Sequence, residues 1–114
     1  MAATEVSKEL MEKVYEAIET AKASGKIKKG TNEVTKAVEK GNAKLVAVAS
    51  DVNPPEIVMH LPVLAKEKDI PCVKVGNREE LGASAGLGLA TTAVAIVSEG
   101  EAKKLIKEIT DEVK

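Results

Sequence analysis

Downstream of Gly25 the chain reads Lys26-Ile27-Lys28-Lys29-Gly30-Thr31-Asn32-Glu33-Val34-Thr35-Lys36. We expect Ile27 to Lys29 to form a short edge strand, which Gly30 separates from a helix over residues 31–40. Thr31 is the expected N-cap of this helix, and Gly41 is expected to end it. Its inward face is predicted from the spacing of three apolar residues, Val34, Ala37 and Val38.

Three different polar groups lie at the start of this predicted helix. Asn32 and Glu33 fall in its first turn, and Lys36 follows four and three residues later, so all three can face the same way. Amides and cations can donate to the keto oxygens of bases, carboxylates can accept from base N–H groups, and helix N-termini attract phosphate. The same residues also fit ordinary helix-start chemistry with a solvated lysine. Spacing alone leaves both interpretations open.

Lysines are concentrated around this stretch. Residues 22–44 hold seven lysines against Glu33 and Glu39, a local balance of +5. The rest of the chain carries 10 basic and 16 acidic residues, a balance of −6. A near-neutral protein with one basic face is typical of a site-specific binder of a phosphate backbone.

Composition limits the classes of protein that fit. The 114 residues suit one domain over residues 1–114, with 44% hydrophobic and 31% charged residues. No apolar run is long enough to cross a membrane, and the polar start of the chain resembles no secretory signal. Cys72 has no second cysteine to pair with and no metal-ligand spacing around it, so we expect a buried strand residue in a reducing, cytoplasmic setting. Tyr15 is the only aromatic residue, which argues against binders that stack bases on aromatic platforms.

Helical and strand patterns alternate along the chain. Helices are expected over residues 7–23, 31–40, 79–85 and 101–113. A further helix is expected after the turn over residues 51–55, and this helix contains Pro62. Strands are expected over residues 27–29, 45–49, 72–75 and 92–97. This alternation predicts an α/β fold, a three-layer α-β-α sandwich around a small mixed four-stranded sheet.

Several segments in collinear order resemble one family. They are residues 29–41, residues 51–57, His60-Leu61-Pro62, Lys68-Asp69-Ile70-Pro71, Glu80-Leu81-Gly82 and Ala85-Gly86-Leu87. Together they are similar to the archaeal large-subunit ribosomal protein L7Ae and its kink-turn-binding relatives, over about residues 5 to 100. The resemblance implies an α-β-α sandwich that binds RNA kink-turns, which are sharply bent helix–bulge–helix elements with tandem sheared G·A pairs.

The resemblance also implies a set of RNA-binding residues. Asn32, Glu33 and Lys36 would contact the guanines of the sheared pairs, and Lys29, Gly30 and Thr31 would lie at the RNA backbone. An apolar loop before the last strand would cover the bulged nucleotides, and it maps to Leu87, Gly88, Leu89 and Ala90. Lys26 and Lys28 are expected to contact phosphates through charge. Core packing is the alternative for Leu87 and Leu89.

The implied setting is ribonucleoprotein assembly. Archaeal members of the family serve in the large ribosomal subunit, in box C/D and H/ACA guide-RNA particles and in RNase P. We therefore expect RNA and ribonucleoprotein proteins as partners, a monomer when free, no cofactor, no metal and no membrane association. The chain departs from the family at Gly88 and Asn53, where acids are common, and at Thr91-Thr92, which replaces alanines. His60 is assigned no role.

Other functions fit the sequence less well. Gly86-x-Gly88-x-x-Thr91 partly matches a dinucleotide fingerprint, but it precedes an expected strand, whereas the fingerprint follows a strand and opens a helix. No phosphate loop, paired catalytic carboxylates or nucleophile–base pair is evident, so an enzyme is disfavoured. A protein–protein module that uses residues 87–90 would leave the lysine cluster unexplained. A member of the same fold with a different RNA target is the remaining alternative.

Overall fold

The computed structural model describes residues 4–5, 8–51, 56–86 and 89–113. In chain order the elements are β1 (Thr4–Glu5), α1 (Lys8–Ser24), β2 (Lys26–Lys29), α2 (Thr31–Glu39), β3 (Leu45–Ala49), α3 (Glu56–Glu67), β4 (Cys72–Val75), α4 (Arg78–Ser84), β5 (Ala93–Ser98), a 3-10 turn (Gly100–Ala102) and α5 (Lys103–Val113).

The sheet has the strand order β1-β4-β3-β5-β2. β3 runs parallel to β4 and antiparallel to β5, and β2 runs antiparallel to β5. The four predicted strands are therefore present and form a mixed sheet, and β1 adds a two-residue parallel strand beside β4. β2, β3 and β4 point in the same direction, so their C-terminal ends lie at one end of the sheet, and the antiparallel strand β5 begins there.

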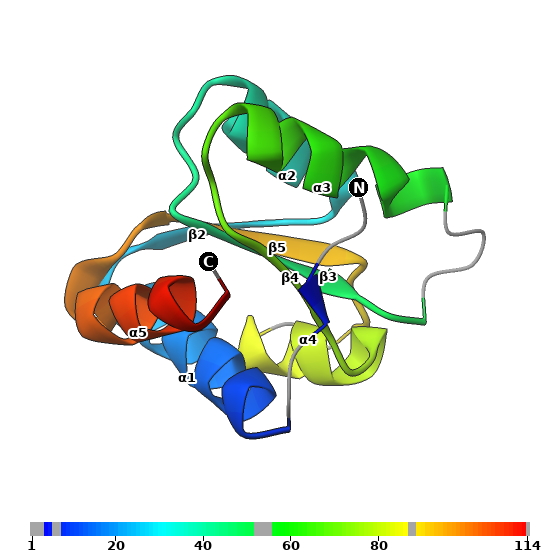
Figure 1. Cartoon of the computed structure of the whole chain (residues 1–114). Helices are drawn as coiled ribbons and strands as arrows, with labels where there is room; N and C mark the ends of the chain where they lie inside the picture. The colour runs from blue at the N-terminus through cyan, green and yellow to red at the C-terminus, as the bar shows by residue number, and fades with distance from the viewer. Residues whose placement is uncertain (1–3, 6–7, 52–55, 87–88, 114) are drawn as a thin grey trace.

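Helices cover both faces of the sheet. α2 and α3 lie on one face, and α1, α4 and α5 lie on the other (Figure 1). All five residues of the central strand β3 are buried because of this double cover. Leu10, Val14, Ile18 and Ala21 recur at helical spacing along α1 and are buried against the core. The predicted three-layer α-β-α sandwich is the observed fold.

The prediction of Thr31 as a helix cap is wrong. Gly30 occupies the N-cap position, and no side chain caps the helix there. The hydroxyl of Thr31 is instead used in a contact with Thr92, 61 residues away in the chain. Gly41 ends the helix as expected, with a φ of +71° and with its N–H donating to the carbonyl oxygen of Val38.

Candidate nucleic-acid interface

Strand pairing brings the two segments of the predicted interface together. The pairing of β2 with β5 sets Lys29 opposite Val94. Just beyond it, the Gly30 N–H donates to the carbonyl oxygen of Ala93 at 2.8 Å, and the Thr31 and Thr92 hydroxyl oxygens lie 2.7 Å apart. The start of α2 and the segment that leads into β5 therefore form one continuous edge of the molecule.

Gly30 determines how the chain passes from β2 into α2. Its φ of +88° and ψ of 153° fall in a region that is almost restricted to glycine. A Cβ built on Gly30 would meet no atom within 4 Å. Glycine is required here by backbone conformation and not by crowding, and the backbone at this point has open space in front of it.

The first turns of α2 present the expected polar side chains to solvent. Asn32, Glu33 and Lys36 are all exposed. Glu33 Oε2 lies 3.9 Å from Nζ of Lys28, with 58% and 49% of the two side chains exposed. An exposed pair of this kind contributes at most about 1 kcal/mol, so it orients the carboxylate without removing it from solvent.

A second contact fixes α2 against α3. The Thr35 hydroxyl donates to the carbonyl oxygen of Thr31 at 2.7 Å and lies 2.8 Å from Nε2 of His60. This second contact joins the Thr35 hydroxyl on α2 to the imidazole of His60 on α3. His60, which sequence analysis left without a role, therefore links the two helices of this layer.

The predicted phosphate-binding lysines lie on the outermost strand of the sheet. Lys26, Lys28 and Lys29 are exposed on β2, which is paired on one side only. Lysines on such a strand also discourage edge-to-edge association. The exposed ammonium groups are available to bind phosphates, and they also keep β2 from pairing with a strand of another molecule.

The apolar contact before β5 is partly described. Leu89 is 80% exposed and Ala90 is exposed, so the alternative of core packing is wrong for Leu89. Leu87 and Gly88 lie outside the described residues, as does Asn53. A Cβ on Gly82 would collide with the Leu89 carbonyl oxygen, so the segment packs tightly against α4 and leaves the leucine side chain in solvent.

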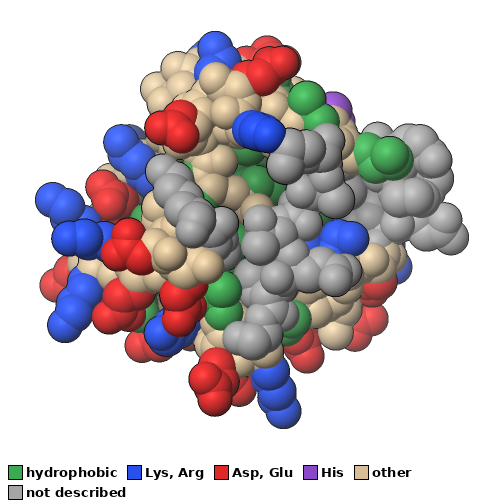
Figure 2. Space-filling model, in the orientation of Figure 1, with side chains coloured by type: hydrophobic (Ala, Val, Ile, Leu, Met, Phe, Trp, Pro, Cys, Tyr) green, Lys and Arg blue, Asp and Glu red, His purple; other side chains and the backbone are tan. Residues whose placement is uncertain are grey.

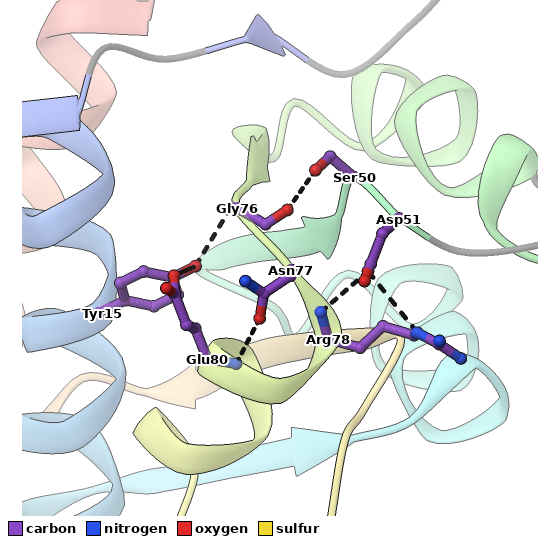
Figure 3. Close-up of polar contacts among 7 residues, drawn as sticks. All are labelled: Tyr15, Ser50, Asp51, Gly76, Asn77, Arg78 and Glu80. Carbon is purple, nitrogen blue, oxygen red and sulfur yellow. Dashed lines mark hydrogen bonds and ion pairs between the residues drawn. The ribbon is translucent and has the colours of Figure 1, made fainter.

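Sequence analysis missed a polar network at the same edge (Figure 3). Asp51 Oδ1 accepts from the backbone N–H of Arg78 at 2.9 Å and lies 3.6 Å from its Nε, while Thr91 N–H donates to the Arg78 carbonyl oxygen at 3.1 Å. Asn77 caps α4 by accepting from Glu80 N–H at 2.7 Å. The Asn-x-x-Glu spacing could have revealed the cap. The contact between Asp51 and Arg78 has no local signal.

Within the described ranges no group of three or more His, Cys, Asp or Glu side chains is arranged to hold a metal ion. In those same ranges no helix combines the length and apolar character needed to cross a membrane. Gly86 and Thr91 follow α4 and precede β5, which is the wrong context for a dinucleotide fingerprint.

The fold and its edge define a class of protein: a three-layer α/β domain in which an edge strand of lysines leads directly into a helix that presents an amide, a carboxylate and an ammonium group. The chain belongs to the ribosomal protein L7Ae/L30e/S12e/Gadd45 family, whose sequence pattern matches residues 12–106. Among solved structures it is similar to the 15.5kD RNA binding protein of Giardia lamblia, with 30% sequence identity and a TM-score of 0.90. That match covers 95% of this chain and 90% of the Giardia chain.

Proposed function

We propose that this chain is a non-catalytic RNA-binding protein of the L7Ae type that recognises kink-turns. The observation that carries the proposal is a pair of hydrogen bonds, Gly30 to Ala93 and Thr31 to Thr92. They place the start of α2, which would read the bases, next to the apolar segment before β5. Family membership and the RNA-binding Giardia protein support RNA as the ligand.

In this proposal the helix start reads the sheared G·A pairs. Glu33 accepts from guanine N–H groups, and Asn32 and Lys36 donate to keto oxygens. The open backbone at Gly30 and Thr31 approaches the RNA strand, where a side chain would stand in the way. An ordinary A-form major groove is too deep and narrow to be read, so the protein requires RNA that is bent and opened.

The other contacts hold the remainder of the bend. Leu89 and Ala90, with Leu87 and Gly88, cover the bulged nucleotides. Lys26, Lys28 and Lys29 neutralise phosphates along the adjoining stem. Arg78 lies next to the segment before β5, because its carbonyl oxygen accepts from the Thr91 N–H, and its guanidinium is paired with Asp51.

The RNAs that we propose are ribosomal RNA and, by the same motif, box C/D and H/ACA guide RNAs and RNase P RNA. All offer a kink-turn to the same edge of the protein. We place the protein in the cytoplasm as a monomer that joins ribonucleoprotein partners after it binds RNA. It uses no cofactor, because bending the RNA needs only a difference in affinity between the bent and extended forms.

A gel-shift titration tests the proposal. We expect the protein to bind a kink-turn RNA at least about 100-fold more tightly than a straight duplex of the same length, equivalent to roughly two guanine contacts at 1–3 kcal/mol each. Equal affinity for the two RNAs would contradict it. Tight binding to a different structured RNA would favour the alternative of another RNA target, and no RNA binding at all would favour a protein–protein module.

A further inference from the structure

A groove lies on the opposite side of the sheet from α2. It runs between α1 and α4, is open to solvent and has a volume of about 360 Å³. Met11, Tyr15 and Ala83 are its apolar lining, and Met11 and Tyr15 are partly buried against the core. Pockets of this size in proteins accept drug-sized ligands or side chains of a partner, and an aliphatic side chain fits the apolar lining.

The rim of this groove is acidic. Glu12, Glu19 and Glu80 line it together with Lys8, and Lys22 lines the adjoining hollow beside Glu19 and Ala83. Figure 2 shows acidic side chains interspersed with lysines over the lower part of the molecule, where α1, α4 and α5 lie in Figure 1. Further exposed acids flank the rim on the same two helices: Glu9, Glu16 and Glu79.

The rim carboxylates are available to a ligand. The Tyr15 hydroxyl donates to Glu80 Oε2 at 3.2 Å and accepts from the Gly76 N–H at 3.1 Å, which holds Glu80 at the mouth of the groove. Among the residues that the structure describes, Glu12 and Glu19 have no ion-pair partner within 4.0 Å.

We infer that the groove between α1 and α4 docks a short cationic segment of a partner protein. The segment places one aliphatic side chain on Met11, Tyr15 and Ala83, and its flanking lysines or arginines meet the carboxylates of Glu12 and Glu19. Charge complementarity selects this occupant, because an acidic rim repels nucleic acid and acidic peptides. The groove and the start of α2 lie on opposite faces of the sheet (Figure 1), while α4 also contacts the segment before β5.

The test uses a capped pentapeptide with two lysines on each side of one leucine. It is titrated into the ¹⁵N-labelled protein, and amide chemical shifts are followed by NMR. We expect saturable shifts at Met11, Tyr15 and Ala83. A peptide with glutamates in place of the lysines should cause none, and a peptide with serine in place of the leucine should bind more weakly. Absence of shifts in the groove, or equal binding of the serine peptide, would overturn the inference.

Two double variants make the test specific. Glu12→Gln with Glu19→Gln removes the rim charge, and we expect a loss of affinity of roughly two- to thirty-fold, as for two exposed ion pairs. Glu39→Gln with Glu67→Gln makes the same change of charge at exposed positions on α2 and α3, and should change affinity by less than about two-fold. Equal losses in both variants would mean non-specific attraction and would overturn the inference.

A third variant blocks the groove without changing the core. Ala83 is exposed on α4, so Ala83→Lys should fold normally while it fills the groove and reverses the local charge. We expect loss of peptide binding and unchanged affinity for kink-turn RNA. Peptide binding at the wild-type level would contradict the inference. An absence of kink-turn binding in every variant and in the wild type would count against the proposed function alone.

Discussion

Replacing Gly30 by alanine tests whether the backbone conformation of this residue sets the position of the start of α2. A φ of +88° with a ψ of 153° costs a non-glycine residue about 1–3 kcal/mol. No clash adds to this, because a Cβ would meet nothing within 4 Å. A chain of 114 residues has an unfolding entropy of about 0.24 kcal/mol/K, so the melting temperature should fall by about 4–13 °C.

Gly41→Ala is the matched control. Gly41 lies just beyond the other end of α2, has a φ of +71°, and also has no atom within 4 Å of a built Cβ. It should lower the melting temperature by about 4–8 °C, because the left-handed conformation costs about 1–2 kcal/mol. Calorimetry gives the stability of both variants, and gel-shift titration gives their affinity for kink-turn RNA.

The two variants should differ in RNA binding. If Gly30→Ala relieves its strain by moving the start of α2, the variant loses affinity for kink-turn RNA, whereas Gly41→Ala keeps it. A Gly30→Ala variant that melts and binds RNA like the wild type would refute the argument from backbone conformation. Equal losses of RNA affinity in the two variants would refute the placement of the site at the N-terminal end of α2.

Four further predictions follow from the same structure. Glu33→Ala should cost about 1–3 kcal/mol of binding free energy for kink-turn RNA and leave binding to a straight duplex unchanged or stronger. Parallel gel-shift titrations with the two RNAs measure this, and equal effects on both would contradict a contact of Glu33 with the bases. Lys26→Ala should lower the slope of log affinity against log salt by up to about one unit for both RNAs, and an unchanged slope would exclude a phosphate contact. Leu89→Glu should weaken the protein-induced shortening of end-labelled kink-turn RNA in magnesium-free buffer, measured by energy transfer, because it places a negative charge against the bulge; full shortening would exclude the contact. Burial raises the pKa of the Cys72 thiol from its ordinary 9.0 to about 12, so the unfolded chain loses this proton first and the free energy of unfolding should fall as pH rises through that window. Urea unfolding across that window should show a smaller fall for Cys72→Ala, and an identical pH dependence would contradict the effect of burial.

Much of the fold could be predicted from local pattern. The bounds of the strands over residues 45–49 and 72–75 agree with the prediction. Residues 45–49 form a continuous apolar run, which is typical of a central strand, whereas in residues 72–75 the buried side chains alternate with partly buried ones. β1 could not be predicted, since two residues carry no periodicity and the strand exists only because it pairs with β4. The helix predicted over residues 101–113 differs at its start, because residues 101 and 102 belong to the 3-10 turn Gly100–Ala102 and the α-helix begins at Lys103.

The error at Thr31 has a clear physical reason. A threonine after a glycine fits the pattern of an N-cap, but the cap position depends on the backbone angles of Gly30 and on where the side chain finds a partner. The partner of Thr31 is Thr92, which reaches it only through the pairing of β2 with β5. Spacing along the chain does not contain that information.

In the candidate site, too, features within one helix could be predicted from the sequence, whereas contacts between different elements could not. Exposure of Asn32, Glu33 and Lys36 could be predicted from helical spacing, since Val34 takes the buried face. The contacts of Glu33 with Lys28 and of Thr35 with His60 join different elements, so they required the structure. The roles proposed for these residues toward RNA stay predictions.

Mapping the RNA footprint on the protein tests the central claim most directly. Amide shifts of the ¹⁵N-labelled protein are compared with kink-turn RNA and with a straight duplex of equal length. With the kink-turn we expect the largest shifts at Gly30, Asn32, Glu33 and Leu89, and with the duplex we expect only weak shifts along β2. Shifts centred on α1 or α5, or the same pattern with both RNAs, would contradict the claim that the joined edge of α2 and the segment before β5 reads a kink-turn.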